Sequence, residues 1–189
     1  MSTVARLTLA EYDRMIAAGV FDERDNRRLE LIRGELREMT PSGPEDDDLI
    51  DLLLNQWSFE NAPRDRIRIR VQEPITLPTA ESAPEPDIAW VVNRRYRYRR
   101  PIVEEVLLLI EVAESSLDYD RGEKAALYAE AGIADYWIVN NPEQCIEVYR
   151  EPGAGRYGSV QTFSGEQEVR PLAFPEAVLR PSMLWPAGT

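Results

Sequence analysis

The stretch VLLLIEVA, residues 106–113, decides the fold, and Glu111 is its only residue that is not apolar. An apolar run of this length predicts a strand that is covered on both faces. A carboxylate inside such a strand is costly to bury unless it is paired or binds a metal. The alternative is a strand end at which Glu111 meets water. The stretch therefore predicts a central strand and marks Glu111 as its unusual position.

Candidate strands lie on both sides of this segment. The expected strands are 67–77, 87–92, 106–113, 135–139 and 146–150. Pro74 indicates a bulge or a sheet edge in the first of them. A helix is expected over 120–131, because Gly132 follows at the position where glycine commonly ends helices. This order is typical of the α/β class, with a central mixed β-sheet flanked by helices.

Further elements are expected at both ends of the chain. A capping-box pattern predicts a short helix from Thr8 to about Gly19. Alternating residues predict a hairpin over 29–39. The acidic residues 46–48 are expected to open another helix, which has a wide apolar face. The residues from Glu151 onward predict hairpins and a tail.

The length of the chain, 189 residues, is that of one ordinary domain. We find no internal repeat or low-complexity linker. A single domain over 1–189 is therefore expected, with a core of about 29–150, an N-terminal helix and hairpin, and a C-terminal hairpin. No apolar run approaches the roughly 20 residues that span a bilayer, so no membrane association is expected. The lone cysteine, Cys145, predicts a cytoplasmic protein.

The chain contains no histidine. This absence excludes Ser-His-Asp and Cys-His catalysis and every metal site that uses histidine. A single cysteine also excludes a structural zinc cluster within one chain. Any catalysis must therefore use carboxylates, a lysine, hydroxyls or bound hard metal ions.

Lysine is nearly absent as well, because Lys124 is the only lysine among 22 basic residues. A compositional bias toward arginine would explain one surviving lysine. However, lysine carries a compact ammonium with a tunable pKa, which arginine does not offer. Asp120, Lys124 and Tyr128 are spaced four residues apart and so share one helix face. This placement favours a specific role for Lys124.

Asp87, Glu111 and Lys124 form a candidate site. Asp87 begins the strand that precedes Glu111, and neighbouring strands lie about 4.8 Å apart. In the right register, the two carboxylates would share one Mg²⁺ or Mn²⁺, ions that prefer oxygen ligands. Such an ion stabilises charge on a phosphate and lowers the pKa of a bound water. The ammonium would orient that water or stabilise the pentavalent phosphorus.

Simpler interpretations exist for two of these residues. Asp87 follows a proline, where turn residues are common. Lys124 would form an exposed pair with Asp120, and such pairs contribute little to stability.

The net charge of −12 argues against a broad electrostatic attraction to nucleic acid. Positive charge is nevertheless concentrated in two segments, 64–70 and 94–100. The second is expected to contact nucleic acid through Arg94, Arg95, Arg97 and Arg99. It joins the strands of Asp87 and Glu111, so we expect it to meet phosphates near the site and to stack tyrosines on bases. The alternative is a solvated charge run.

Seven short motifs follow one another in a fixed order. They are LELIRGE at 29–35, MTPSGP at 39–44, PEPD at 84–87, IEVAES at 110–115, DRGEK at 120–124, YAEAG at 128–132 and DYWIV at 135–139. This series resembles the Uma-two family of restriction-endonuclease-like proteins, in the PD-(D/E)XK nuclease superfamily. The resemblance spans roughly residues 7–150.

The resemblance implies a restriction-endonuclease-like core and a metal-dependent endonuclease that hydrolyses DNA phosphodiester bonds with Mg²⁺ or Mn²⁺. It implies Asp87 and Glu111 as metal ligands and Lys124 as the catalytic lysine. The lysine would have moved to the helix after the strand, since the usual strand position holds Ala113. A homodimer, with one site for each DNA strand, is expected by analogy.

Three further residues are assigned by the resemblance. Glu35 matches the family's acidic residue after glycine, and it is expected to add a ligand or a contact to water. Gln72 and Tyr128 are expected to contact the metal-binding carboxylates rather than the metal itself.

One departure concerns a histidine that relatives usually carry after the Ser-Gly-Pro-Glu stretch. Here three aspartates, residues 46–48, follow that stretch. The loss would alter or weaken activity, and three acids would repel a phosphate backbone. A second hypothesis is therefore a nuclease-fold protein without turnover that binds metal, nucleic acid or protein. A purely structural acidic domain would leave Glu111 and Lys124 unexplained.

Overall fold

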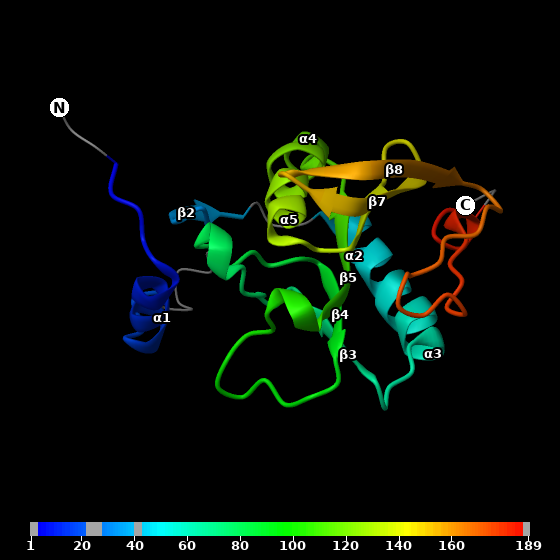
Figure 1. Ribbon diagram of the computed structural model, residues 1–189. Coiled ribbons are helices and arrows are strands. Elements are labelled where there is room, and N and C mark those ends of the chain that lie inside the picture. The colour runs from blue at the N-terminus through cyan, green and yellow to red at the C-terminus, as the bar shows by residue number, and fades with distance from the viewer. Residues whose placement is uncertain (1–3, 22–27, 40–42, 187–189) are drawn as a thin grey trace.

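The computed structural model describes residues 4–21, 28–39 and 43–186. Its centre is a six-stranded mixed sheet in the order β3-β4-β5-β6-β7-β8 (Figure 1). The strands are β3 (Ile67–Val71), β4 (Ile88–Val92), β5 (Val106–Ala113), β6 (Asp135–Asn140), β7 (Cys145–Gly153) and β8 (Arg156–Ser164). β5 and β6 are parallel, and the other neighbours are antiparallel. The predicted α/β class and mixed sheet are confirmed.

β5 lies inside the sheet and is covered on both faces, as its apolar run predicts. Ile110 and Val112 belong to one hydrophobic core, whereas Leu109 and Ala113 belong to the core on the opposite face. Because side chains alternate along a strand, Glu111 shares the second face. The carboxylate at this position is therefore directed at whatever covers that face.

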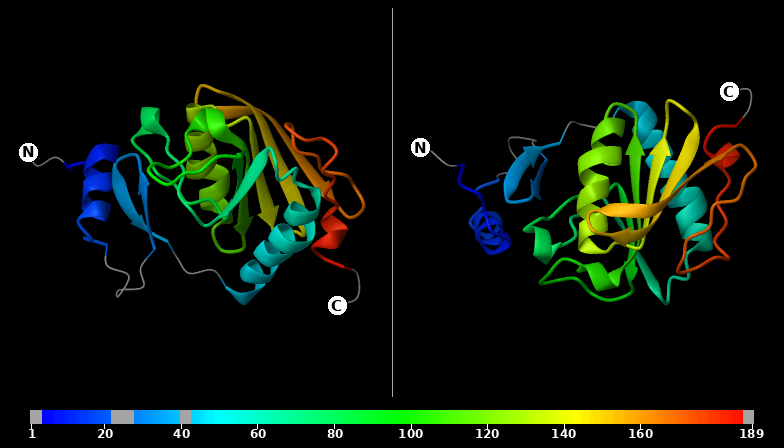
Figure 2. Two further views of the ribbon diagram at one scale, coloured as in Figure 1. Left: turned by 90° about the horizontal axis from the view of Figure 1, so that it is seen from below. Right: turned by 45° about the horizontal axis from the view of Figure 1, so that its top comes forward.

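The second face is covered by one continuous helix that follows β5 (Figure 2). It runs from α4 (Leu117–Tyr119) through a π-helical stretch (Asp120–Lys124) into α5 (Ala125–Ala131). Gly132, with a φ of 92°, ends the helix in the left-handed region that favours glycine. The helix begins earlier than the predicted residue 120, because Ser116 takes the position that precedes its first turn.

The first face is covered by a second helix and by the C-terminal segment. The helix comprises α2 (Pro44–Asp51), a π-helical stretch (Leu52–Ser58) and α3 (Phe59–Asn61). Its Trp57 stacks on Trp90 of β4 with ring centroids 4.8 Å apart. This large aromatic burial fixes the helix against the sheet.

The N-terminal additions form a separate small unit beside the sheet (Figure 1). It contains α1 (Leu9–Ala17) and the antiparallel hairpin of β1 (Leu29–Ile32) and β2 (Glu35–Glu38). Gly34 in the hairpin turn has a φ of 77°, and a Cβ there would lie 2.8 Å from the carbonyl oxygen of Leu7. Glycine is therefore required where the N-terminal segment crosses the turn.

One predicted strand is shorter than expected. β3 ends at Val71 rather than at residue 77, because Gln72 has a φ of 49° and turns the chain out of the sheet. The backbone N–H of Gln72 then donates to the carbonyl oxygen of Asp87 at 3.0 Å. β3 lies at the sheet edge, which agrees with the interpretation of Pro74.

The loop between β4 and β5 is organised around Glu105, whose side chain is 8% exposed. Its carboxylate accepts two hydrogen bonds from Arg99, both 2.6 Å long, and pairs with Arg94 at 2.7 Å. The hydrogen bonds from Arg99 are the main cause that lowers the pKa of Glu105 to about 2. Arg94 and Arg99 therefore hold the loop together through their contacts with Glu105.

We predict that Glu105→Gln lowers stability in a pH-dependent way. Because the folded-state pKa is depressed, the charge of Glu105 contributes stability above the unfolded pKa of about 4.3. That contribution is lost as the pH falls toward 2. The difference in unfolding free energy between wild type and variant, measured in urea, should thus be largest at neutral pH and shrink below about pH 4.3. A difference independent of pH would contradict this role.

Candidate active site

Asp87 and Glu111 lie side by side at adjoining ends of β4 and β5. Ile88 pairs with Ile110, so Asp87, the residue before β4, lies opposite Glu111 near the end of β5. The backbone N–H of Asp87 approaches Glu111 Oε2 at 3.4 Å, and the N–H of Val112 donates to Asp87 Oδ2 at 2.8 Å. The expected register is therefore the one found.

Lys124 extends from the helix toward these carboxylates. Its Nζ donates to Glu111 Oε1 at 2.9 Å, and the Tyr128 hydroxyl donates to the same oxygen at 2.8 Å. Residues 124 and 128 point the same way because they are one helical turn apart. Glu111 and Lys124 are only 2% and 4% exposed, so an exposed Asp120–Lys124 pair is excluded.

Asp120 lies on the same helix face and is also buried. Its Oδ1 is 3.8 Å from Lys124 Nζ, and Ser116 donates to its Oδ2 at 2.6 Å. Burial raises the pKa of Asp120 to about 6, against the opposing attraction of Lys124. Asp120 thus adds negative charge to the cluster.

A fourth carboxylate, Glu30, enters from the N-terminal hairpin. It is 2% exposed, accepts a hydrogen bond from the Tyr119 hydroxyl at 3.2 Å, and raises the pKa of Lys124 electrostatically. Its other oxygen is 3.3 Å from the backbone nitrogen of Glu85. Glu30 therefore connects β1 to the helix after β5 and to the segment before β4.

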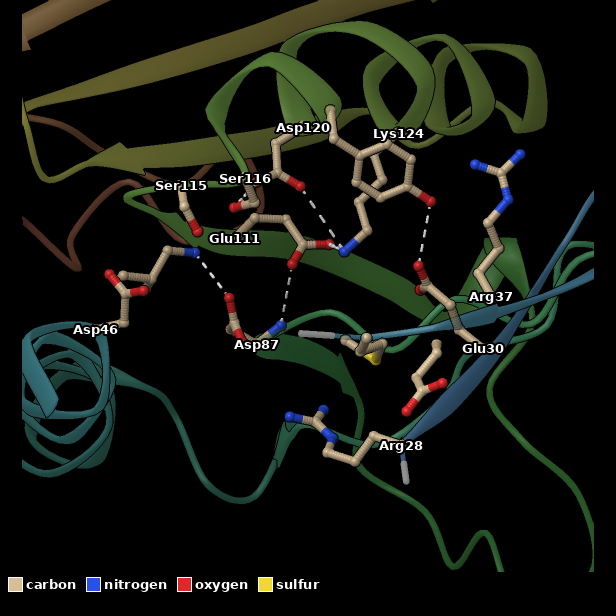
Figure 3. A pocket seen from close by; sticks show the side chains of 14 residues that line it. Arg28, Glu30, Arg37, Asp46, Asp87, Glu111, Ser115, Ser116, Asp120 and Lys124 are labelled. Atoms are coloured by element: carbon tan, nitrogen blue, oxygen red, sulfur yellow. Dashed lines mark hydrogen bonds and ion pairs between the residues drawn. The ribbon is translucent and has the colours of Figure 1, made fainter. Parts of the chain in front are cut away.

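These side chains surround a cavity of about 400 Å³ (Figure 3). Its lining includes Arg28, Glu30, Arg37, Glu38, Met39, Asp46, Asp87, Glu111, Val112, Ser115, Ser116, Tyr119, Asp120 and Lys124. The hairpin and α2 supply opposite walls, while β4, β5 and the helix after β5 supply the floor. Three parts of the chain therefore build one recess.

Negative charge exceeds positive charge in this recess. Burial raises the pKa of both Asp87 and Glu111, and Lys124 opposes that effect in each case. Burial would lower the pKa of Lys124, but the surrounding carboxylates outweigh burial and raise it. The lysine is therefore an ammonium, and one ammonium does not balance the buried carboxyls. Such a cluster attracts protons or a cation.

Asp46 of α2 is the cavity residue with an unused polar atom. Its Oδ1 is buried and, among the described residues, has no hydrogen-bond partner. Burial, then repulsion from Glu114 and Asp87, raises the pKa of Asp46 to about 6. Asp46 is the first of the three aspartates that follow the Ser-Gly-Pro-Glu stretch.

Glu35 is not brought together with the buried carboxylates, and its expected role stays a prediction. Glu35 lies on β2 outside the cavity lining, its side chain is 36% exposed, and it pairs with Arg6 and Arg37. The buried acid from the hairpin is Glu30 instead. Both acids lie on one face of the hairpin, because Glu30 pairs with Arg37 and Arg37 is two residues from Glu35. Glu35 differs in its place along that face, since it lies next to the turn and outside the cavity lining.

Gln72 and Tyr128 lie where they were expected, next to the carboxylates. Gln72 Nε2 is 3.4 Å from Asp87 Oδ1, and Tyr128 donates to Glu111 as described above. What these residues do in a reaction stays a prediction.

The arginine loop does not lie beside the carboxylates. It joins the end of β4 to the start of β5, whereas Asp87 precedes β4 and Glu111 lies near the end of β5. An antiparallel pair places these positions at opposite ends. None of Arg94, Arg95, Arg97 and Arg99 lines the cavity. The predicted proximity is therefore wrong, although a contact with nucleic acid stays a prediction.

Sequence reasoning missed Glu30 and Asp46, although both had a signal. Glu30 is the single charged residue of the strand LELI, just as Glu111 interrupts the apolar run of β5. Asp46 is the first of three consecutive aspartates at the start of a helix. The contacts of Arg28 and Arg37 with Glu85 and Glu123 had no signal, because they join segments far apart in sequence.

Comparisons with known proteins find a similar fold among solved structures. Among solved structures, the chain is similar to a "putative nuclease belonging to DUF820" from Anabaena variabilis ATCC 29413, with a TM-score of 0.72 and 17% identity over 95% of this chain and 97% of that one. The comparison with curated proteins finds no significant match. The chain thus shares the α/β fold of that protein.

The family model Uma2, described as "Putative restriction endonuclease", matches residues 9–182. The chain therefore belongs to the Uma2 family, and the resemblance read from the motifs is confirmed. Within the described ranges, no helix is long and apolar enough to cross a membrane.

We predict that Lys124→Met destabilises the protein more than Glu111→Gln does, when both are measured with EDTA present. Loss of the lysine leaves the buried carboxyls without their cation, and breaking a buried pair in this way costs about 3–5 kcal/mol. Loss of the Glu111 charge relieves repulsion among the remaining acids. Urea unfolding monitored by circular dichroism measures both changes. Equal destabilisation would show that excess negative charge is absent.

Proposed function

We propose that this protein is a metal-dependent endonuclease that hydrolyses phosphodiester bonds in DNA. The observation that carries the proposal is the convergence of Asp87, Glu111 and Lys124 on the floor of one cavity. Membership in the Uma2 family supports the nuclease assignment. The absence of histidine leaves carboxylates and an ammonium as the groups suited to phosphoryl chemistry.

The donor atoms of Asp87 and Glu111 fit Mg²⁺ or Mn²⁺. Each carboxylate has one firmly held oxygen, Asp87 Oδ2 on Val112 and Glu111 Oε1 on Lys124. The other oxygen of each makes only a contact of 3.4 Å. One oxygen therefore orients each carboxylate, and the second is available to a ligand.

A complete protein cage is not required for this type of ion. Among the residues that the structure describes, no group of three or more acidic, histidine or cysteine side chains is arranged to hold a metal. Mg²⁺ commonly binds one or two carboxylates and completes its coordination with water and substrate phosphates. Asp87 and Glu111, with the excess negative charge around them, match that mode.

A bound Mg²⁺ would supply charge stabilisation at a phosphate oxygen and a water of lowered pKa. The protein's own contribution begins with Lys124, whose buried ammonium is placed to donate to an oxygen that gains negative charge. Tyr128 and Gln72 hold Glu111 and Asp87 in position. Burial excludes bulk water and strengthens each of these interactions.

We predict that Asp87→Asn and Glu111→Gln abolish Mn²⁺ binding in calorimetry and reduce plasmid nicking at least about 100-fold. Lys124→Met should reduce nicking similarly while the protein still binds Mn²⁺. Glu166→Gln is the matched control, because Glu166 is exposed and distant from the cavity lining. Wild-type protein that is folded and binds no Mn²⁺, even with DNA present, would refute the metal site.

A comparison of Glu30 and Glu35 tests which of the two hairpin acids supports activity. Glu30→Gln should lower nicking, because Glu30 adds to the potential that holds the Lys124 proton. Glu35→Gln should leave nicking near the wild-type level, since Glu35 lies outside the cavity lining and its side chain is 36% exposed. The reverse order of effects would restore Glu35 as the functional acid.

Asp46 favours one alternative, a nuclease-fold protein that binds without turnover. It adds a carboxyl to the lining of the cavity that contains Asp87 and Glu111, and this negative charge would repel a phosphate. Mn²⁺ binding by wild type without nicking would support this alternative. The homodimer expected by analogy stays a prediction, which sedimentation velocity would test.

A further inference from the structure

Four exposed side chains form a basic and aromatic surface away from the cavity. We call it the arginine surface, and it consists of Arg68, Arg95, Arg97 and Tyr98. Arg68 lies on the edge strand β3, and the others lie in the loop after β4. Tyr98 is 87% exposed. The surface is near the β4–β5 turn, at the opposite end of these strands from the carboxylates.

The neighbouring arginines differ from those of the arginine surface, because they form ion pairs with acidic side chains of the protein. Arg94 and Arg99 hold Glu105, and Arg100 pairs with Asp13 of α1. Arg70 pairs with Glu73, and its guanidinium lies over the ring of Tyr96. These residues build the loop and fix it to β3 and α1.

Arg68, Arg95 and Arg97 are different, because none forms an ion pair within the described parts of the chain. Arg97 stacks on Tyr98, with its guanidinium 5.2 Å from the ring centroid. Arg68 is close enough to Arg70 to lower the pKa of Arg70, although burial is the larger cause. The positive charge of this surface is therefore not neutralised by the protein.

The chemistry of the surface fits a nucleic-acid backbone. A guanidinium fork binds phosphate oxygens in a bidentate manner. An exposed tyrosine offers a face on which an unpaired base stacks. Because the chain as a whole carries a charge of −12, a polyanion can approach it favourably only through a local positive surface.

We propose that the arginine surface is a second contact site for nucleic acid, separate from the catalytic cavity. This inference rests on the proposed function for its choice of a nucleic-acid partner. β4 has five residues, so the two sites lie roughly 16 Å apart along the strand. That distance corresponds to about five base pairs of duplex rise. A long polynucleotide reaches both sites, whereas a small phosphodiester reaches only the cavity.

The first test measures DNA binding with EDTA present, so that it does not depend on catalysis. The variant is the double substitution Arg95→Gln and Arg97→Gln, with a labelled 30-nucleotide single strand and its duplex as probes in fluorescence anisotropy. We expect the affinity to fall about tenfold at low salt, and the salt dependence of log K to decrease by roughly two ions. Tyr98→Ala should weaken binding of the single strand more than of the duplex.

The matched control is the double substitution Arg156→Gln and Arg180→Gln, which removes the same charge from β8 and from the C-terminal segment. Equal weakening by both double variants would overturn the proposal, since net charge alone would then explain binding. Weaker self-association of the Arg95/Arg97 variant in sedimentation, with unchanged DNA binding, would also overturn it and assign the surface to a second copy of the chain.

The second test separates this proposal from the proposed function. In Mn²⁺, the Arg95/Arg97 variant should show a raised KM on a long oligonucleotide and unchanged kinetics on bis(p-nitrophenyl) phosphate. If wild type cleaves neither substrate but the variant loses DNA affinity, the arginine surface stands and the endonuclease proposal fails. If wild type cleaves DNA and the variant binds and cleaves normally, the arginine surface is overturned.

Discussion

The hydrogen bond between Lys124 and Glu111 joins the sheet to the helix that covers it, and the rest of the site is arranged around that bond. An ammonium with 4% exposure needs carboxylate partners. Several buried acids provide them, from β5, from the helix and from the N-terminal hairpin. The acids outnumber the lysine, so the recess carries an excess of negative charge. One structural requirement thus accounts for both the packing and the chemistry of the recess.

Much of the fold follows from local patterns. The apolar run 106–113 has the same bounds as β5. The alternation of side chains along a strand predicts that Glu111 faces a covering layer. Helical spacing places Lys124 and Tyr128 on one face, where the structure finds them. Asp87 is predicted as a site residue because a strand begins beside it. These features depend on spacing along one strand or one helix, which a single sequence displays directly.

Other features depend on contacts between distant segments, and sequence alone does not contain them. Glu30 and Glu35 share one face of the hairpin, and how the hairpin docks decides that Glu30 rather than Glu35 lines the cavity. The arginine loop connects the strands of Asp87 and Glu111, and connectivity alone predicts that it lies beside the carboxylates. The lengths and antiparallel direction of β4 and β5 instead put it at their far end. β3 is shorter than predicted because Gln72 adopts a left-handed backbone conformation. Glutamine rarely adopts that conformation, so the sequence does not predict it.

The docked hairpin has a consequence for the order of assembly. Lys124 and Glu111 are 13 residues apart in sequence, whereas Tyr119 and Glu30 are 89 apart. Contacts of low sequence separation form with a smaller loss of chain entropy. The pair on the floor of the recess therefore belongs to a local unit, and the wall that carries Glu30 is a long-range addition. A nascent chain cannot complete the recess until that unit, residues 106–131, meets the hairpin synthesised long before it.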